Sequence, residues 1–279
     1  IFNFSQLSNY LKILEESFEN TVLKIHIKVN SGMNRLGFDK NEILELVKIV
    51  KKYNLNNKSK NRLEIISIFS HISDAENQAE TEKQVEKYEN ILKIFDKNNV
   101  KYQYKHLQAS PLLFKYGEKY NYDFARVGMA LYGMEPLSYD VGLFDVITVK
   151  SQIINIRNVK KNDKISYGSK GVVKRDSKIG IVSIGYAHGL QKQIENSQEA
   201  YVLVNGKKAK IVGEICMDMI FVDLTEINDA EINDEVVIVG SQKNVENGVN
   251  ERITLRQVAR WAGTIQDDVL TKFSVIKKQ

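Results

Sequence analysis

The first part of the chain, from residue 1 to about residue 135, alternates short runs of β-branched residues with longer amphipathic segments. This alternation is the signature of βα units built around a parallel sheet. Asp39, with Glu42 three residues later, forms a capping box that predicts where the second helix begins. The predicted strands are residues 21–29, 63–71, 102–108 and 124–127, and the predicted helices are residues 5–18, 40–53 and 81–98.

After about residue 142 the pattern changes to runs rich in Val and Ile with few helices between them. Asn205-Gly206 separates two of these runs and predicts a tight hairpin turn. We therefore expect a mainly antiparallel β domain over residues 143–279, following an α/β domain over residues 1–142. Its strands are predicted at residues 146–156, 178–184, 201–204, 209–224 and 235–239, with a helix at 254–262 and a final apolar run at 269–276.

Composition excludes several classes of protein. The net charge of +5 comes from 40 basic and 35 acidic residues that are interleaved along the chain, which indicates a solvated surface and not a nucleic-acid site. Cys216 is the only cysteine, so an internal disulfide and a cysteine-rich metal centre are excluded, and no metal site is expected. No apolar run approaches the roughly 20 residues that span a bilayer, so neither a membrane partner nor a location outside the cytoplasm is expected.

In α/β barrels, chemistry takes place at the carboxyl ends of the strands, so the loops after the predicted strands are the first place to look for a site. Residues 28–38 (KVNSGMNRLGF) follow the first of them, and six further short motifs come later in the chain. They are His71, residues 106–110 (HLQAS), 126–133 (RVGMALYG), 166–168 (SYG), 185–187 (GYA) and 216–218 (CMD). The seven motifs, in this order, resemble those of the alanine racemase family over nearly the whole chain.

This resemblance implies a homodimeric enzyme that interconverts L- and D-alanine through a pyridoxal-phosphate aldimine and so supplies D-alanine for the cell wall. Racemisation takes the Cα proton from one face and returns a proton to the other, so two bases must flank the reacting carbon. The resemblance also implies a fold: a partial (β/α)8 barrel, from about its fourth strand onward, followed by the β domain.

The resemblance assigns the catalytic roles to three residues. Tyr167 is similar to the family's tyrosine base, and His71 and Arg126 match the members that form a chain with that tyrosine. A tyrosine with an ordinary pKa near ~10 is a poor base at neutral pH, so it needs positive or hydrogen-bonding neighbours. Arg126 also matches the arginine that faces the pyridine nitrogen, where it leaves that nitrogen unprotonated because a guanidinium keeps its proton.

Further residues match the binding positions of the family. Arg35 is similar to the arginine that contacts the cofactor's phenolic oxygen and the substrate carboxylate, and Lys28 falls where many members carry a carbamylated lysine, although an ordinary strand-end lysine fits that position equally well. The matches to the phosphate cradle are Ser110, Gly128 and Met129, and the matches to the substrate-binding and entrance residues are Met217 and Tyr186.

The chain departs from the family at several positions. The family's Schiff-base lysine lies in a motif close to Lys-Ala-Asn-Ala-Tyr-Gly, which nothing here matches, so we expect residues 1–279 alone to be poorly soluble and unable to form the aldimine. Asp267 falls where a phosphate-contacting tyrosine is usual, His188 replaces an aspartate, and Glu214 replaces a basic residue. A non-catalytic truncated remnant and a related pyridoxal-phosphate amino-acid decarboxylase therefore stay open as alternatives.

Overall fold

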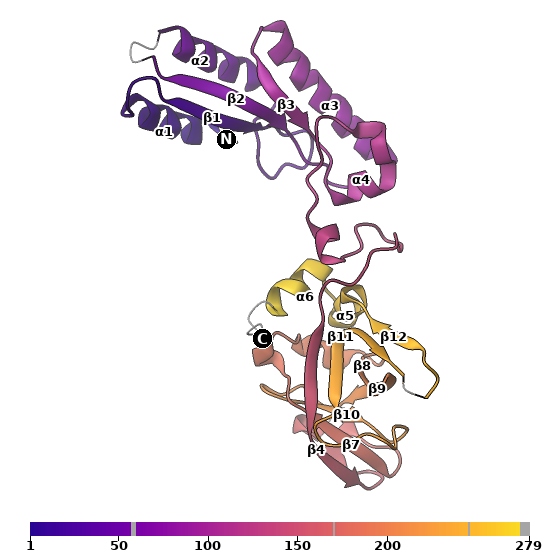
Figure 1. The fold of residues 1–279 in the computed structure, drawn as a ribbon. Helices are drawn as coiled ribbons and strands as arrows, with labels where there is room; N and C mark the ends of the chain where they lie inside the picture. The colour runs from indigo at the N-terminus through magenta and orange to yellow at the C-terminus, as the bar shows by residue number, and fades with distance from the viewer. Residues whose placement is uncertain (57–59, 170, 245, 274–279) are drawn as a thin grey trace. The chain divides into compact units, whose positions relative to one another are not determined.

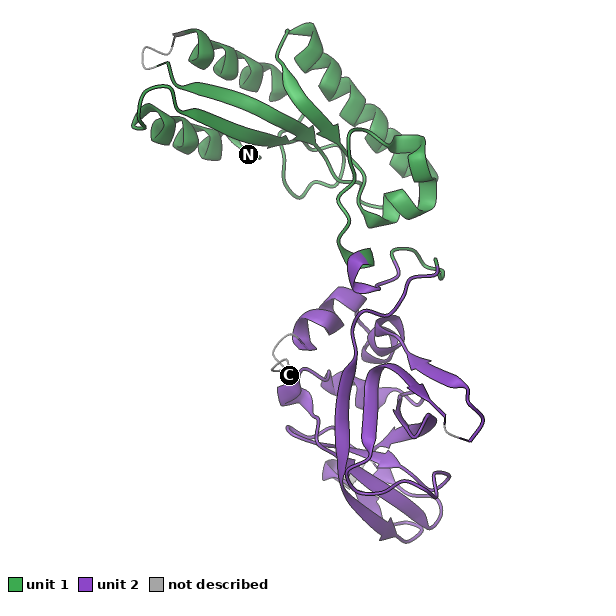
Figure 2. Ribbon diagram, viewed as in Figure 1, with its two compact units in different colours: residues 1–130, 136–141 green, residues 131–135, 142–279 purple. Residues whose placement is uncertain are grey.

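A computed structural model describes residues 1–56, 60–169, 171–244 and 246–273 of the protein. The chain divides into two compact units (Figure 2). The first unit contains residues 1–130 and 136–141, and the second contains residues 131–135 and 142–279. In the part that the structure describes, no helix is both long enough and apolar enough to cross a membrane.

The first unit is a three-stranded parallel sheet in the order β1-β2-β3, with helices between the strands (Figure 1). As the sequence predicts, strand and helix alternate along the chain. The elements are α1 (Phe4–Glu15), β1 (Val22–Lys28), α2 (Ile43–Asn56), β2 (Arg62–Phe69), α3 (Gln78–Lys97), β3 (Tyr102–His106) and α4 (Ser110–Tyr116).

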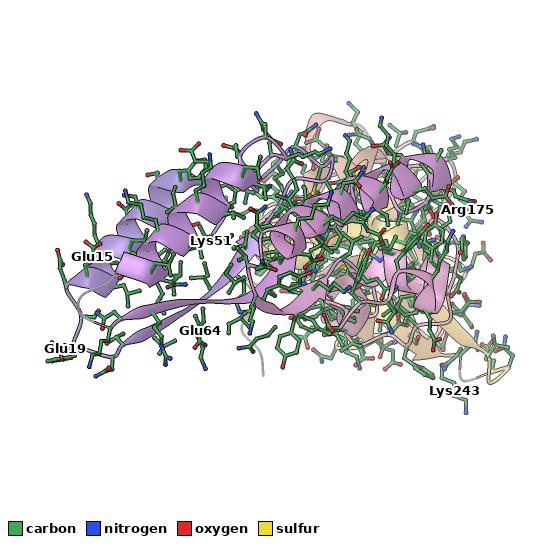
Figure 3. The ribbon with its side chains drawn as sticks, turned by 90° about the horizontal axis from the view of Figure 1, so that it is seen from above. Glu15, Glu19, Lys51, Glu64, Arg175 and Lys243 are labelled. Atoms are coloured by element: carbon green, nitrogen blue, oxygen red, sulfur yellow. The ribbon has the colours of Figure 1, made fainter. Side chains whose placement is uncertain are left out.

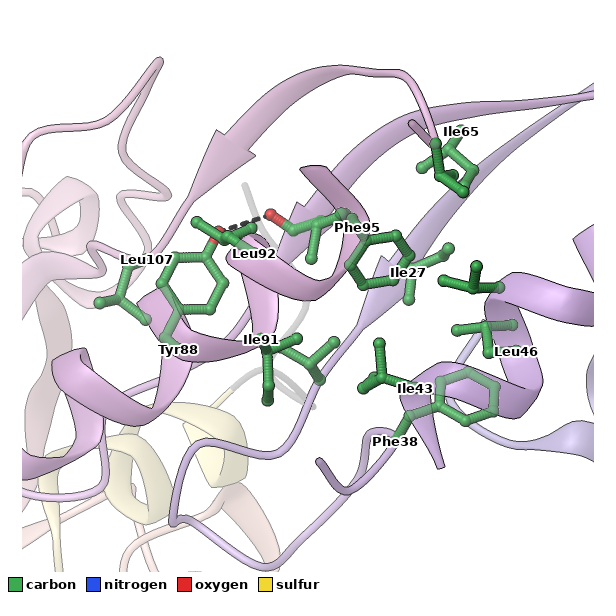
Figure 4. Close-up of a cluster of buried hydrophobic side chains, with 14 of the residues drawn as sticks. Ile27, Phe38, Ile43, Leu46, Ile65, Tyr88, Ile91, Leu92, Phe95 and Leu107 are labelled. Carbon is green, nitrogen blue, oxygen red and sulfur yellow. Dashed lines mark hydrogen bonds between the residues drawn. The ribbon is translucent and has the colours of Figure 1, made fainter. Parts of the chain in front are cut away.

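The core of this unit lies between the sheet and its helices (Figure 4). Tyr88, Ile91 and Phe95 of α3 are three to four residues apart, so they share one face of the helix, and all three are buried. The Tyr88 hydroxyl donates a hydrogen bond of 2.7 Å to the Ile68 carbonyl of β2. Each such apolar side chain contributes roughly 1.5–3 kcal/mol when it is fully buried, so this face fixes α3 against the sheet.

The opposite face of the sheet carries polar side chains. In β1, Ile25 and Ile27 are buried in the core, whereas Lys24, His26 and Lys28 alternate with them and point to the other face. Figure 3 shows the helices on one side of the sheet and Glu64 pointing away from them, with other charged side chains, such as Glu15 and Lys51, projecting from the ribbon.

Two predicted elements of this unit differ from the structure. Residues 124–127 do not form a strand, because only one backbone bridge, between Ala109 and Arg126, joins them to a neighbour. The capping box at Asp39 forms only in part: the Asp39 N–H donates to the Glu42 carboxylate (2.7 Å), while the Asp39 carboxylate accepts from Asn30 instead. As a result, α2 begins at Ile43 rather than at residue 40.

The second unit is a mainly antiparallel β domain. Its large sheet has the order β12-β11-β4-β7-β10-β9-β8, and β8 also pairs with β11, so the sheet closes on itself. The strands are β4 (Val149–Val159), β5 (Lys164–Ile165), β6 (Gly171–Val172), β7 (Ser177–Val182), β8 (Tyr201–Val204), β9 (Lys207–Val212), β10 (Ile220–Asp223), β11 (Glu235–Lys243) and β12 (Asn250–Ile253), and the helices are α5 (Leu255–Ala262) and α6 (Gln266–Phe273).

The predicted hairpin at Asn205-Gly206 is present between β8 and β9. Both residues have positive φ angles, 51° and 71°, as a two-residue turn of this kind requires. The predicted strand at residues 209–224 is instead two strands, β9 and β10, with a loop between them that carries Cys216 and Met217. The predicted final run at residues 269–276 forms part of α6, and residues 274–276 lie outside the described residues.

Candidate active site

The carboxyl ends of the three parallel strands present one row of side chains. Lys28 of β1 pairs in register with Phe69 of β2, and Phe69 pairs with His106 of β3. Residues in register on neighbouring parallel strands point to the same face of a sheet. Lys28, Phe69 and His106 therefore lie side by side on the face that the helices leave open.

Arg126 lies over this row. Its backbone N–H donates to the Gln108 carbonyl (2.9 Å), which fixes the residue beside the end of β3. Its guanidinium donates from Nη2 to the Ser70 carbonyl (2.6 Å) and from Nη1 to Nδ1 of His106 (2.5 Å), and its Cζ lies 5.3 Å from the centre of the Phe69 ring. These contacts hold the planar group in one orientation.

His71, two residues beyond the end of β2, also contacts this guanidinium. Its Nδ1 lies 3.4 Å from Nη2 of Arg126. Burial, followed by the charges of Arg126, Arg35 and Lys28, lowers the pKa of His71 from 6.5 to about 4. The imidazole is therefore neutral at physiological pH and can accept a hydrogen bond.

Arg35 is placed by the loop that follows β1. Phe38 returns to the strand through its N–H, which donates to the Lys28 carbonyl (3.0 Å), and its carbonyl accepts from Asn30. Gly37 permits this return: its φ is 122°, and a Cβ there would lie 2.7 Å from the Val29 backbone. The loop leaves Arg35 exposed but close enough to lower the pKa values of Lys28 and His71.

Lys28 belongs to the same positive cluster. Burial is the first cause that lowers its pKa, and the charges of Arg35 and Arg126 lower it further. Its Nζ lies 6.0 Å from the centre of the Phe69 ring. Lys28, Arg35 and Arg126 thus form an electropositive cluster beside two histidines, which suits an anionic ligand. Within the described residues, no three His, Cys, Asp or Glu side chains gather as a metal site.

Ser110 and Gly128 lie next to each other near this cluster in the fold. Ser110 is the first residue of α4 and is buried, and its hydroxyl accepts a hydrogen bond of 3.1 Å from the Gly128 N–H. A Cβ at Gly128 would meet no atom within 4 Å, so the backbone is open there. Met129 follows at the start of the short helix Met129–Tyr132.

The remaining predicted site residues belong to the second unit. Tyr167, Tyr186 and Met217 are 71%, 44% and 54% exposed. Backbone hydrogen bonds from Tyr186 to Cys216 (3.1 Å) and from Ala187 to Met217 (3.0 Å) hold two of their loops together, and the Ser166 hydroxyl donates to the Glu214 carbonyl (2.8 Å). These contacts bring the three large side chains onto neighbouring loops of one unit.

The positions that depart from the family pattern have local partners. His188 accepts a hydrogen bond from the Gly185 N–H through Nδ1 (3.2 Å), so it caps the turn that carries Tyr186. Glu214 lies 3.4 Å from the ammonium group of Lys192. Asp267 lies in the first turn of α6 and is exposed, which is a favourable place for a carboxylate because the helix N-terminus is partially positive.

Sequence reasoning did not assign a role to His106, Ser67, His26 or Phe69, which the structure connects to Arg126. The sequence places His106 at the end of a predicted strand region and in the motif of residues 106–110, but a single histidine there does not by itself indicate a role. The only further signal was the two aromatic residues beside it, Phe69 and Phe124, and in a sequence such residues usually indicate a hydrophobic core.

Two family profiles cover almost all of the chain. The alanine racemase N-terminal domain matches residues 1–136, and the alanine racemase C-terminal domain matches residues 146–278. The chain is 34% identical over 273 residues to an alanine racemase of Thermodesulfovibrio yellowstonii, covering 98% of this chain and 68% of that protein. It is 35% identical to alanine racemase 2 of Caldanaerobacter subterraneus, covering 93% of this chain and 65% of that protein. The chain thus spans about two thirds of the length of the curated relatives that it matches.

Solved structures give the same result. The alanine racemase of Enterococcus faecalis matches with a TM-score of 0.80 and 28% identity, covering 98% of this chain and 69% of that one. The enzyme of Pseudomonas aeruginosa matches with a TM-score of 0.79 and 26% identity, covering 99% and 70%. The fold and the basic site define the class of racemases that join a barrel-like α/β domain to an antiparallel β domain. Within that class, the chain belongs to the alanine racemase family.

Proposed function

We propose that the protein interconverts L- and D-alanine with pyridoxal phosphate as its cofactor. The observation that carries the proposal is the cluster at the strand ends, in which Arg126 contacts a neutral His71 and lies beside Lys28 and Arg35. Membership of the alanine racemase family supports the reaction, and the cluster supports binding of an anionic cofactor and an amino-acid carboxylate.

The described residues fit the phosphate, the ring nitrogen and the phenolic oxygen of the cofactor. The Ser110 hydroxyl and the neighbouring backbone at Gly128 and Met129 would hold the phosphate, because a hydroxyl can donate to a dianion and no side chain at Gly128 obstructs its approach. Arg126 would face the pyridine nitrogen and Arg35 the phenolic oxygen and the substrate carboxylate. When bound, pyridoxal phosphate withdraws electrons from the substrate Cα and so makes its proton removable.

Proton movement at Cα is assigned to Tyr167. His71 is neutral and accepts from Arg126 at Nδ1, which leaves the proton on Nε2 free to be donated. In a dimer, a hydrogen bond from His71 of one subunit would stabilise the Tyr167 phenolate of the other, and the charge of Arg126 would support it. His71 and Arg126 therefore tune the tyrosine, and Tyr167 takes the proton from one face of the substrate carbon.

We also propose that the protein is a homodimer whose sites are shared. Tyr167, Tyr186 and Met217 are exposed on neighbouring loops, and exposed large side chains that gather in this way are typical of interaction surfaces. They would reach the cofactor of the other subunit. Sedimentation velocity at assay concentrations tests this: we expect a dimer, and a fully active monomer would rule out shared sites.

Lys28 is the candidate for carbamylation. Its lowered pKa increases the share of neutral amine, which adds to carbon dioxide through its nitrogen and releases one proton. The resulting carbamate would be countered by Arg35 and Arg126 and would orient Arg35. Carbon-13 NMR in labelled bicarbonate should show a carbamate signal that is absent in Lys28→Met.

We further propose that the first unit is part of a (β/α)8 barrel, from about its fourth strand onward, within residues 1–142. Parallel strands are usually covered on both faces, and the open face of this sheet carries the functional row. The position of the site at the carboxyl ends of the strands supports this assignment.

The activity is tested with the protein expressed from its gene and supplied with pyridoxal phosphate. We expect D-alanine to form from L-alanine, measured by chiral chromatography, and we expect His71→Ala to reduce the rate more than Tyr10→Phe, a change at a surface tyrosine. Release of carbon dioxide from basic amino acids without racemisation would instead indicate the decarboxylase.

A further inference from the structure

A chain of hydrogen bonds leads from Arg126 across the open face of the sheet. His106 contacts Nη1 of Arg126 through Nδ1 (2.5 Å) and the Ser67 hydroxyl through Nε2 (3.0 Å). The Ser67 hydroxyl also contacts Nδ1 of His26 (2.7 Å). The three partners come from β1, β2 and β3, and Ser67 is fully buried.

The chemistry of the groups gives each bond a direction. A guanidinium has only donors, so Nδ1 of His106 must accept, and a neutral His106 then carries its proton on Nε2. That N–H donates to the Ser67 oxygen, which leaves the Ser67 hydroxyl proton free to donate to Nδ1 of His26. The bonds therefore run in one direction, from Arg126 to His106, Ser67 and His26.

Two aromatic rings hold His106 in the plane that this chain requires. The centre of the Phe69 ring lies 4.9 Å from the centre of the imidazole, with an interplanar angle of 10°. The centre of the Phe124 ring lies 4.3 Å from it, with an angle of 27°. Stacking restricts rotation of the imidazole out of its plane but does not decide which nitrogen carries the proton. The hydrogen bonds at its two edges decide that.

An irregularity in β2 brings Ser67 into the chain. Ile25 pairs with Ile65 but His26 pairs with Ser67, so β2 contains one extra residue at this point. The residues of β2 that pack in the hydrophobic core change accordingly, from Leu63 and Ile65 to Ile68, and Ser67 lies on the opposite face, where it meets His26 and His106. Bulges of this kind often re-aim side chains beside active sites.

We propose that Ser67 and His26 are positioning residues for Arg126, because Ser67, itself bonded to His26, accepts the Nε2 proton of His106 and so holds in place the imidazole whose Nδ1 accepts from the guanidinium. The proposal rests on the function proposed for Arg126, which is to face the cofactor. Neither Ser67 nor His26 touches the reacting atoms in this arrangement. Their effect reaches the site only through His106.

The first experiment observes the histidine protons directly, without cofactor. Residues 1–279 contain four histidines, and nitrogen-15 NMR of the histidine-labelled protein expressed from its gene can resolve each of these rings once single-histidine variants assign the signals. We expect the His106 proton on Nε2 and slow exchange of that proton with water. Ser67→Ala should raise its exchange rate by about tenfold or more, because a buried N–H loses its acceptor.

Three further variants complete the test. Ser177→Ala removes a strand hydroxyl in the second unit, which bonds only the Arg175 carbonyl in the described contacts, and should leave His106 unchanged. His26→Leu removes the last acceptor at an exposed position and should also speed exchange, whereas His26→Asn keeps an acceptor near Nδ1 and should restore the slow rate. If Ser67→Ala does not fold, the two His26 variants still decide the question.

The second experiment measures catalysis in the cofactor-loaded protein. We expect Ser67→Ala to lower kcat about tenfold, with the KM for alanine changed less than about twofold. A His106 proton on Nδ1, or exchange that does not respond to Ser67→Ala, overturns the inference even if the protein is a racemase. A wild-type protein without racemase activity overturns the proposed function instead, and the NMR result still tests the hydrogen-bond chain.

Discussion

Nη2 of Arg126 lies 3.4 Å from Nδ1 of His71, so the imidazole must accept from a group that can only donate. The same guanidinium donates to Nδ1 of His106 on its other side. Burial, followed by the charge of this arginine, keeps both histidines neutral, and the arginine fixes the nitrogen that carries the proton in each. This relationship makes the electrostatics of the cluster testable without the cofactor.

The charge of Arg126 should be visible in the titration of His71. Arg126→Gln removes the charge that follows burial as a cause of the low pKa, so the pKa of His71 should rise from about 4 toward 6.5 without reaching it. Arg175→Gln, a change at an exposed arginine of the second unit, serves as the control. NMR titration of the histidine rings measures both. A His71 pKa that stays near 4 in Arg126→Gln would show that burial and the remaining charges set it without Arg126.

The stability of the protein should fall between pH 6.5 and about 4. His71 and His106 have folded-state pKa values of about 4, below the ordinary 6.5, so the unfolded chain binds protons in this range that the folded chain does not. The stabilisation is complete above pH 6.5 and is lost as the pH falls. Urea unfolding at a series of pH values measures this, and His71→Asn should make the slope shallower. An equal slope in both proteins would contradict the assigned shift.

Tyr167→Phe should impair exchange from the L side more than from the D side. The resemblance to the alanine racemase family implies that the tyrosine takes the proton of L-alanine, and the variant removes only the phenolic oxygen. Deuterium wash-in from each enantiomer, measured in the cofactor-loaded protein, separates the two directions. Tyr186→Phe makes the same chemical change on a neighbouring loop and should affect both directions alike. Equal exchange from both enantiomers in Tyr167→Phe would remove this residue from the mechanism.

Gly37→Ala should destabilise the loop that positions Arg35. A Cβ at Gly37 would lie 2.7 Å from a backbone atom of Val29, and the φ of 122° is unfavourable for any other residue. We expect a loss of about 1–3 kcal/mol in the free energy of unfolding, measured by urea denaturation. Gly128→Ala is the matched control, because the added carbon would meet no atom within 4 Å. A Gly37→Ala protein as stable as wild type would show that the loop can rearrange freely.

The periodic parts of the fold were predictable from the sequence, and the exceptions have physical reasons. The order of strands and helices follows from local patterns, as does the Asn205-Gly206 turn. The extra residue in β2 could not be predicted, because Ile65, Ile66, Ser67 and Ile68 form a nearly continuous apolar run with no alternation to reveal which side chain faces the core. A strand at residues 124–127 was expected from β propensity, but propensity cannot supply the neighbouring strand that pairing requires.

The candidate site likewise contains some residues that could be predicted from the sequence and others that could not. Arg126 and His71 were singled out because they stand in motifs, and the structure brings them into contact. His106 also stands in a motif, residues 106–110, but its role, like that of Ser67, emerges only when three strands, distant in sequence, are laid side by side. A site built across a sheet depends on register, and register is set by tertiary packing rather than by any one segment.

The second pairing of β8, with β11 as well as β9, has a consequence for how the β unit unfolds. Six strands form a ring, so no strand can leave it without breaking its pairing with two neighbours. Closing the long loops between strands costs entropy, and this cost is fully offset only when the last pair of strands forms. The ring should therefore open as one unit. Hydrogen exchange should give amides of β4, β8 and β11 the same opening free energy, although these strands are separated by up to about half of the unit's sequence.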